Sequence, residues 1–192
     1  MKDKLLVIDN YDSFTFNLVQ MFGQFDLDIS VYRNKEIGKA ELSAIAPDYL
    51  MISPGPKSPK HSGITMRAIS EYYQKVPVLG VCLGMQCINE LFGGETVRSH
   101  PPVHGKTSAV NHDMKGIFSQ VPNPFQAVRY HSLQVYLHAE SPLRVAAQSE
   151  DGTIMAVSHP GLPLYGIQFH PESFLTEHGY TIVQNFLDAK RE

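Results

Sequence analysis

Short runs of apolar, β-like residues alternate with helix-like patterns through the first half of this chain. Such alternation is typical of βαβ units, whose strands line up in a mainly parallel sheet. We therefore expect an α/β fold built on an open, mainly parallel sheet with helices on both faces. The expected strands are residues 5–9, 29–32, 49–53 and 78–81, and the expected helices are about 14–25, 64–74 and 84–92, the first capped by Asp12 or Ser13.

The second half of the chain is less regular, and its turn signals indicate antiparallel strands. Proline and asparagine separate β-like stretches near Thr96, Val128, Val145, Ile154 and Ile167. The chain closes on a predicted helix at about 181–189, because apolar residues recur there at helical spacing. No internal repeat or linker interrupts the pattern, and 192 residues fall within the usual size of one domain. We expect a single domain over residues 1–192.

Composition and charge exclude several classes of function. The formal net charge of -3 gives no basic field for a nucleic-acid backbone, so nucleic acid is not an expected partner. The apolar run 5–8 is far shorter than a signal-peptide core or a membrane span, so we expect a cytoplasmic protein without membrane association. Two cysteines, Cys82 and Cys87, predict neither a disulfide framework nor a zinc site. No pattern is typical of a nucleotide, metal or flavin site, and we expect no cofactor.

A thiol lies between two glycines where a buried strand meets a helix, in the segment G-V-C-L-G at residues 80–84. The pattern matches the strained strand-to-helix turn that exposes a nucleophile, with cysteine in place of serine. The positive end of the following helix favours a thiolate, and its unpaired N–H groups could hold an oxyanion. The alternative is that Cys82 is a small buried hydrophobe and the glycines only allow close packing. Cys87, one helical turn later, is expected in the core.

A histidine and a carboxylate follow another β-like run, two residues apart. Pro171 biases His170 toward extended backbone, in which residues two apart project to the same side, so His170 and Glu172 can cooperate. A carboxylate on one ring nitrogen orients a histidine while the other nitrogen takes a thiol proton. We therefore predict Cys82 as nucleophile, His170 as its base and Glu172 as the orienting acid. Most other histidines are assigned to surface or core positions, including His61, His100, His112, His138 and His178.

Three stretches together resemble the class I, or triad-type, glutamine amidotransferases, whose fold is a flavodoxin-like open α/β sheet. They are S-P-G-P at 53–56, G-V-C-L-G-M-Q at 80–86 and F-H-P-E-S at 169–173, and their order and spacing span nearly the whole chain. Three further matches are more specific, D-N-Y-D-S-F-T at 9–15, H-G-K-T-S at 104–108 and R-Y-H-S-L at 129–133. These resemble the small subunit shared by anthranilate synthase and aminodeoxychorismate synthase.

The resemblance implies a glutaminase that hydrolyses L-glutamine to glutamate and ammonia through a thioester on the nucleophilic cysteine. Ammonia would pass to the chorismate-using large subunit of a synthase, which is the implied protein partner. The sequence leaves open whether that partner makes anthranilate, aminodeoxychorismate or both. The implied oxyanion donors are the backbone N–H groups of Gly55 and Leu83. Gln86, Ser132 and Leu133 are implied to hold the amino-acid end of glutamine.

The expected order of strands supports this site independently. Gly55 and Cys82 both follow parallel strands, so both loops should lie at the carboxyl edge, where open α/β sheets bind ligands. Simpler interpretations exist for these residues: Gly55 could be only a turn glycine, and Ser132 could be only a strand-end hydroxyl. Residues 104–108 could be a plain exposed loop, whereas the resemblance implies that they face the partner. The loop 54–63 holds three prolines, two glycines and two lysines, so little apolar burial is expected to fix it.

Two residues depart from the pattern of the family. Lys57 occupies a position where glycine is usual, and a left-handed backbone there would cost about 1–2 kcal/mol in a residue with a Cβ atom. Met85 stands where histidine is common, and because it lies outside the triad we expect it to affect packing or contact with the partner. Lys57 therefore puts the shape of the loop near glutamine in question.

Two other functions fit parts of the sequence. A catalytically idle regulatory or scaffold subunit could keep the fold only to bind a synthase, but the presence of Cys82, His170 and Glu172 argues against it. A cysteine hydrolase or peptidase could use the same turn, but Gln86 and the strip 129–133 would then have no role. Purified protein incubated with glutamine, and separately with peptides or esters, would distinguish these functions.

Overall fold

One nine-stranded sheet runs through the computed structural model, which describes residues 2–190 but not the side chains of 100–104. The strand order is β2-β1-β3-β4-β9-β8-β7-β5-β6. The first five strands in this order run parallel, and the remaining pairings are antiparallel. The strands are β1 (Asp3–Asp9), β2 (Leu27–Arg33), β3 (Tyr49–Ile52), β4 (Val78–Val81), β5 (Glu95–His112), β6 (Phe125–Tyr136), β7 (Arg144–Ser149), β8 (Ile154–Ser158) and β9 (Leu164–Ile167).

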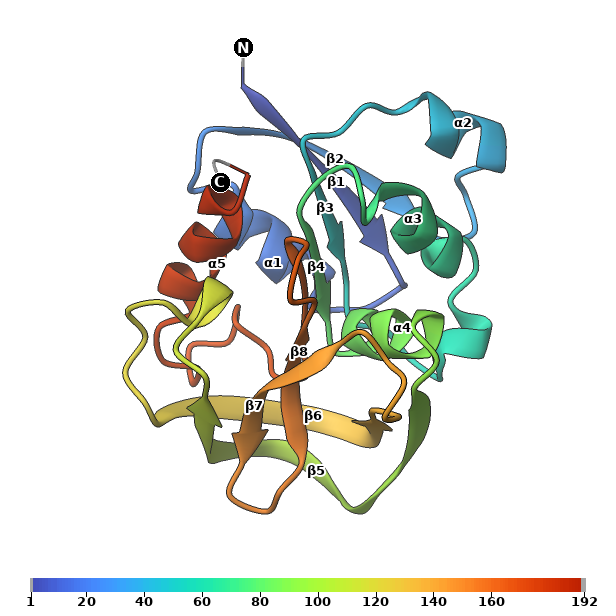
Figure 1. Cartoon of the computed structure of the whole chain (residues 1–192). Helices are drawn as coiled ribbons and strands as arrows, with labels where there is room; N and C mark the ends of the chain where they lie inside the picture. The colour runs from blue at the N-terminus through green and yellow to red at the C-terminus, as the bar shows by residue number, and fades with distance from the viewer. Residues whose placement is uncertain (1, 191–192) are drawn as a thin grey trace.

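Helices cover both faces of the parallel part of the sheet, as expected (Figure 1). Helices α1 and α5 pack on one face, and α2, α3 and α4 pack on the other. The helices are α1 (Thr15–Phe22), α2 (Lys39–Ala44), α3 (Thr65–Tyr72), α4 (Leu83–Leu91) and α5 (Gly179–Asp188), with short 3-10 turns at Pro59–His61 and Gly116–Phe118. Among the described residues, no helix has the length and apolar character needed to cross a membrane.

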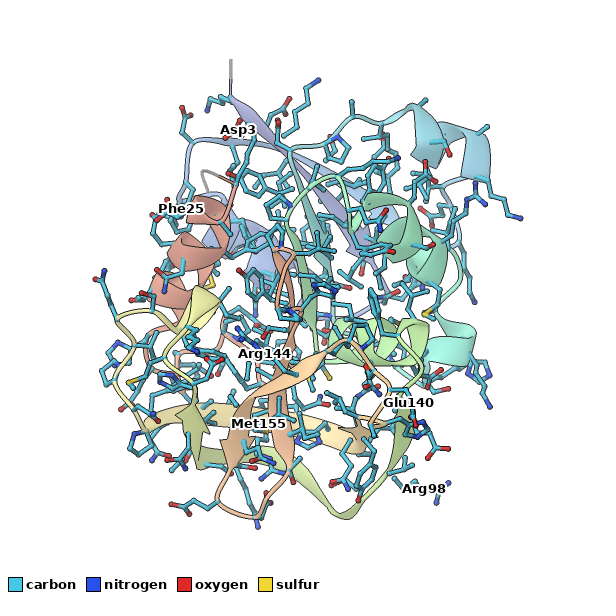
Figure 2. The ribbon with its side chains drawn as sticks, viewed as in Figure 1. Asp3, Phe25, Arg98, Glu140, Arg144 and Met155 are labelled. Carbon is cyan, nitrogen blue, oxygen red and sulfur yellow. The ribbon has the colours of Figure 1, made fainter. Side chains whose placement is uncertain are left out.

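The side chains of β1 project alternately into two apolar cores, one on each face of the sheet. Leu5 and Val7 project into the core under α1 and α5, whereas Leu6 and Ile8 project toward α3 and α4. This period of two, with all four of these side chains buried, is typical of a central strand covered on both faces. Figure 2 shows side chains filling the space around the ribbon, and Met155 of β8, labelled there, extends the first core into the antiparallel part. The two parts of the sheet therefore share a core.

Some elements differ from the sequence-based expectation for local reasons. Helix α2 escapes prediction because Leu42 is the one buried residue among its six, so no apolar periodicity marks it. Helix α1 begins at Thr15 with Phe14 as its N-cap, while the side chain of Asp12 accepts the Phe14 N–H before the helix starts. Residues 104–108 are not a loop, because their backbone belongs to β5 and includes a β-bulge.

Strand β9 lies parallel beside β4, although the antiparallel strands separate the two in sequence. The sequence predicts antiparallel strands around Ile167. This prediction is confirmed for the pairing of β9 with β8 and is wrong for its pairing with β4, which is parallel. Val81 pairs with Ile167, and the N–H of Cys82 donates to the Ile167 carbonyl at 2.7 Å. The segment after β9 is thereby placed next to the turn after β4, at the carboxyl edge of the sheet.

Candidate active site

The turn after β4 holds Cys82 in a strained backbone conformation. Its φ and ψ angles are 53° and -102°, and Cys82 is the N-cap of α4. A positive φ in a residue with a Cβ atom costs about 1–3 kcal/mol and persists where the surrounding structure enforces it. The residue is buried, with 8% of its surface exposed. The geometry agrees with the predicted nucleophile turn, whereas an ordinary packed cysteine would need no such strain.

The two glycines of this turn allow α4 to approach the sheet closely. A Cβ atom at Gly84 would lie 2.6 Å from the Ile52 carbonyl oxygen, and one at Gly80 would lie 2.5 Å from the carbonyl carbon of Gly84. A side chain at either position would push the helix away from β3 and β4. The glycines therefore set where the N-terminus of α4, and with it the thiol, sits above the sheet edge.

His170 and Glu172 form a buried pair beside the turn. Nδ1 of His170 lies 2.7 Å from Oε1 of Glu172, and 4% and 2% of the two side chains are exposed. Nε2 of His170 has no hydrogen-bond partner among the described residues. Because the carboxylate occupies Nδ1, Nε2 is the ring atom left to exchange a proton with a thiol.

Neighbouring side chains stabilise the charged form of His170. Burial alone would lower the pKa of this imidazole, but its interactions with the side chains of Cys82 and Glu172 raise the pKa well above the ordinary histidine value. The three side chains predicted as a triad therefore lie together. An imidazolium beside the cysteine favours the thiolate, which is the form that attacks carbon.

Two aromatic rings and a further carboxyl group, none of them predicted as site residues, surround His170. Phe14 and Tyr130 contact the imidazole edge-on, each with ring centroids 5.7 Å from it. Asp12 lies close to His170 and Glu172, and burial raises the pKa of its carboxyl group. The loop after β1 and strand β6 thus keep water from the base, of which 3% is exposed.

A cleft of about 690 Å³ opens beside Cys82. Gly55, Gln86, Ser132 and Leu133 all line it, and the volume is ample for one amino acid. Ser132 lies within β6 and not at a strand end. Leu83, the remaining residue predicted at this site, is buried against Gly55, where a Cβ atom added to the glycine would come within 2.7 Å of the Leu83 Cδ2 atom.

Comparison with known proteins identifies the family. The family model described as glutamine amidotransferase class-I matches residues 6–189. The chain belongs to the class I glutamine amidotransferases. It is 48% identical over 189 residues to the aminodeoxychorismate/anthranilate synthase component 2 of Bacillus subtilis (strain 168), covering 98% of this chain and 97% of that protein. It is 46% identical over 189 residues to the anthranilate synthase component 2 of Pseudomonas aeruginosa, covering 95% and 94%.

Solved structures confirm the expected fold class of this amidotransferase. A protein from Thermoplasma acidophilum, described as one of the subunits of a GMP synthase, matches with a TM-score of 0.87 at 25% identity, covering 100% of this chain and 95% of that one. A glutamine amidotransferase from Thermotoga maritima matches with a TM-score of 0.76 at 14% identity, covering 100% and 99%, which shows the shared fold alone.

Asn10 fixes the loop that carries Gly55 in this amidotransferase. Its backbone N–H donates to Ser53 Oγ at 2.8 Å, and its side-chain amide donates to the Ser53 carbonyl at 2.9 Å. Its Oδ1 accepts from the Asn34 amide at 2.8 Å and from the Thr65 hydroxyl at 2.6 Å. This second residue of the D-N-Y-D-S-F-T motif therefore joins the loops after β1, β2 and β3, a role that the motif alone does not reveal.

The loop 54–63 is better anchored than its composition predicts. Pro54 and Pro59 are buried, so the expectation that little burial fixes this loop is wrong at its start and in its middle. Pro56 and Lys57, at its tip, are exposed. The exposed part of the loop nearest to Gly55 is therefore this tip.

Lys57 adopts the left-handed backbone that glycine favours, with a φ of 70°. We predict that Lys57→Gly raises the free energy of unfolding by about 0.5–1 kcal/mol, since relief of about 1–2 kcal/mol of strain is partly offset by the greater unfolded-state entropy of glycine. Urea unfolding measures the change. Lys60→Gly is the matched control, because Lys60 lies in a 3-10 turn without a positive φ and should lose stability. Equal losses in both variants would contradict the strain assigned to Lys57.

Met85 and Cys87 are core residues of α4, as predicted. Met85 is fully buried and packs against β9, where a Cβ atom at Gly166 would come within 2.8 Å of its Cγ. Cys87 is also fully buried, and burial raises the pKa of its thiol to about 12. Methionine in place of the usual histidine therefore acts on packing against β9, and burial disfavours the reactive thiolate form of Cys87.

Gln168 contacts the predicted nucleophile, although no pattern singled it out. Its Nε2 donates to Cys82 Sγ at 3.3 Å, and its Oε1 accepts from Gln86 Nε2 at 3.3 Å. The residue is fully buried. The available signal was a polar side chain between Ile167 and Phe169, because a buried amide is costly unless it is hydrogen-bonded. Gln168 links a predicted substrate residue to the thiol.

The other histidines named from the sequence lie outside the triad. His112 is buried and stacks on a phenylalanine, and His138 and His178 are exposed, as assigned. His61 is exposed as well, but it lines the cleft. The side chain of His100 falls outside the described residues. Of these histidines, His61 is the one that the described cleft lining includes.

Proposed function

We propose that this amidotransferase hydrolyses L-glutamine through a thioester on Cys82 and delivers the ammonia to a synthase subunit that uses chorismate. The observation that carries the proposal is the buried pair of His170 and Glu172 beside Cys82, at a cleft lined by Gln86 and Ser132. The relatives from Bacillus subtilis and Pseudomonas aeruginosa are both named as component 2 of such synthases, which supports the assignment of the partner.

The reaction begins when Nε2 of His170 takes the thiol proton and the sulfur of Cys82 bonds to the amide carbon of glutamine. The carbonyl π electrons move to oxygen, and the N–H groups of Gly55 and Leu83 hold the oxyanion. The imidazolium then protonates the departing nitrogen, so ammonia leaves with the C–N electrons and the thioester remains. Water, deprotonated by the same imidazole, hydrolyses the thioester to glutamate and free thiol. Glu172 keeps the ring oriented throughout.

Ammonia needs a dry path to its acceptor, because in water most of it would become the non-nucleophilic ammonium ion. A partner docked over the active-site edge would enclose that path. Apolar side chains exposed at this edge support such docking. Phe174, 94% exposed, follows the triad closely in sequence, and the partly exposed rings of Phe14 and Tyr130 contact His170.

The isolated glutaminase chain is expected to hydrolyse glutamine slowly, and the partner with chorismate bound is expected to accelerate it. The N–H of Gly55 must lie about 2.7–3.1 Å from the developing oxyanion, and a missing donor costs about 10²–10³-fold in rate. Because the exposed tip of the loop adjoins Gly55, a partner surface can shift the loop toward the competent geometry. The measurement is glutaminase kcat and KM for this chain by itself, with partner, and with partner plus chorismate.

Equal rates in all three conditions would exclude activation through the loop and leave a constitutive glutaminase. Hydrolysis of peptides or esters in place of glutamine would favour a general cysteine hydrolase, and inactivity toward glutamine even with the partner would favour an idle scaffold. Pull-down of the partner from native extract, followed by a product assay with chorismate, distinguishes synthesis of anthranilate from synthesis of aminodeoxychorismate.

A further inference from the structure

A buried arginine lies at the start of the strip that lines the cleft. Arg129 of β6 is 3% exposed, and its guanidinium lies 2.7 Å from Asp151. Its Nε donates to His131 Nε2 at 3.0 Å, and its other nitrogens donate to Ser108 at 3.3 Å and Thr153 at 3.1 Å. An apolar cluster would fill the same space without the cost of burying a charge, so stability alone does not explain this cation.

These hydrogen bonds determine the tautomer of His131. The Nε–H of Arg129 can only donate, so Nε2 of His131 accepts. The carbonyl oxygen of Leu133 can only accept, so Nδ1, at 2.9 Å, carries the proton. Burial, and next the charge of Arg129, lower the pKa of His131 to about 4. The hydrogen bond to Leu133 and the charge of Asp151 raise this pKa, and His170 lowers it further. The imidazole is therefore neutral at physiological pH and locked with its proton on Nδ1.

The bond to Leu133 supports the strip where the pairing with β5 is irregular. Arg98 pairs with Leu133, and the register then resumes at Val103 and His131, so the ladder is broken between these pairs. Arg98, labelled in Figure 2, marks the start of this break. Ser132 and Leu133 both line the cleft beside the thiol. Their orientation therefore depends on bonds other than a regular ladder.

We propose that Arg129, His131 and Asp151 are positioning residues that hold the Leu133 carbonyl and thereby orient the strip that binds the amino-acid end of glutamine. Asp151, in the hairpin between β7 and β8, holds the guanidinium. The guanidinium selects the tautomer of His131, and the imidazole holds the carbonyl. The inference rests on the proposed glutamine site and assigns a function to the R-Y-H-S-L motif beyond Ser132 and Leu133.

Arg129→Met removes the donor to His131 while keeping an unbranched side chain of similar reach. The imidazole then loses its anchor on Nε2, so the ring can rotate away from the Leu133 carbonyl and the Nδ1–H bond weakens. We expect KM for glutamine to rise about tenfold while kcat stays within about threefold. Nitrogen NMR of the ring should show the Nδ1–H tautomer in the native protein and a mixture of the two neutral tautomers in the variant. Arg144→Met is the matched control, because Arg144 donates to Ser158 and does not line the cleft, so KM should not change.

His131→Phe tests the same link if Arg129→Met does not fold. It keeps a planar ring and the Arg129–Asp151 pair but removes the donor to Leu133, so KM should rise by a similar factor. The double variant Arg129→Met/His131→Phe should have a KM for glutamine no higher than either single variant, since both substitutions break the same chain of contacts to the Leu133 carbonyl. An unchanged KM in His131→Phe, or an Nε2–H tautomer in the native protein, would overturn the inference.

Labelling of Cys82 separates this inference from the proposed function. Iodoacetamide has no amino-acid end and should alkylate the native protein and Arg129→Met at equal rates. A reactive ketone analogue of glutamine should inactivate the variant about tenfold more slowly at concentrations below saturation. If neither reagent labels Cys82 in the native protein, the proposed function fails. If both reagents label native protein and variant equally, only the positioning role fails.

Discussion

Replacing Cys82 by alanine should reduce glutamine-dependent synthesis by a factor of about 10⁴ or more and leave ammonia-dependent synthesis by the partner intact. Only the release of ammonia needs the thiol, so ammonia supplied from solution bypasses the loss. The side chain makes no capping bond to α4, and the hydrogen bond that it accepts from Gln168 is weak, so the fold should survive. The measurement is the initial rate of product formation from chorismate with either glutamine or an ammonium salt.

Cys87→Ala is the matched control for this variant. It also removes a thiol from α4, but one that is fully buried in the core. It should keep glutamine-dependent synthesis and lose some stability instead. Glutaminase activity retained by Cys82→Ala would remove Cys82 from the mechanism, and loss of ammonia-dependent synthesis would show that the variant fails to support the partner.

His170→Ala should be nearly as damaging as loss of the thiol, within about tenfold, because nucleophile and base act as one unit. Glu172→Gln should be milder by about 10²-fold, since the carboxylate orients the ring through its 2.7 Å contact with Nδ1 and does not touch the reacting atoms. Glutaminase kcat with the partner present measures both effects. His138→Ala, on an exposed histidine, is the control and should be fully active. A fully active Glu172→Gln would withdraw Glu172 from the triad.

The parallel half of the fold could be read from the sequence because each central strand is a short apolar run followed by a turn signal. The predicted strand 78–81 has the same bounds as β4, because all four residues are buried and form one apolar run. Helix α2 lacked that signal, with one buried residue. The placement of β9 beside β4 could not be read locally, because a strand of four residues carries no mark of which neighbour it will pair with.

The triad positions were accessible to sequence reasoning because their chemistry is local. A thiol between two glycines and a histidine two residues from a glutamate are each visible within a few positions. Asn10, Gln168 and Arg129 were missed because their roles depend on partners far away in the sequence, such as Ser53, Cys82 and Asp151. A polar residue in an apolar run shows only that some partner must exist, not which one.

The separation of β4 from β9 along the chain also determines the order in which the two parts of the site are synthesised. A polypeptide emerges from the ribosome amino end first, so the turn that bears Cys82 is synthesised well before the strand that precedes His170. The N–H of Cys82 bonds to Ile167, which means that the strained turn gains this support only when β9 has docked. A chain that ends before β9 therefore lacks both this support and His170, the predicted base.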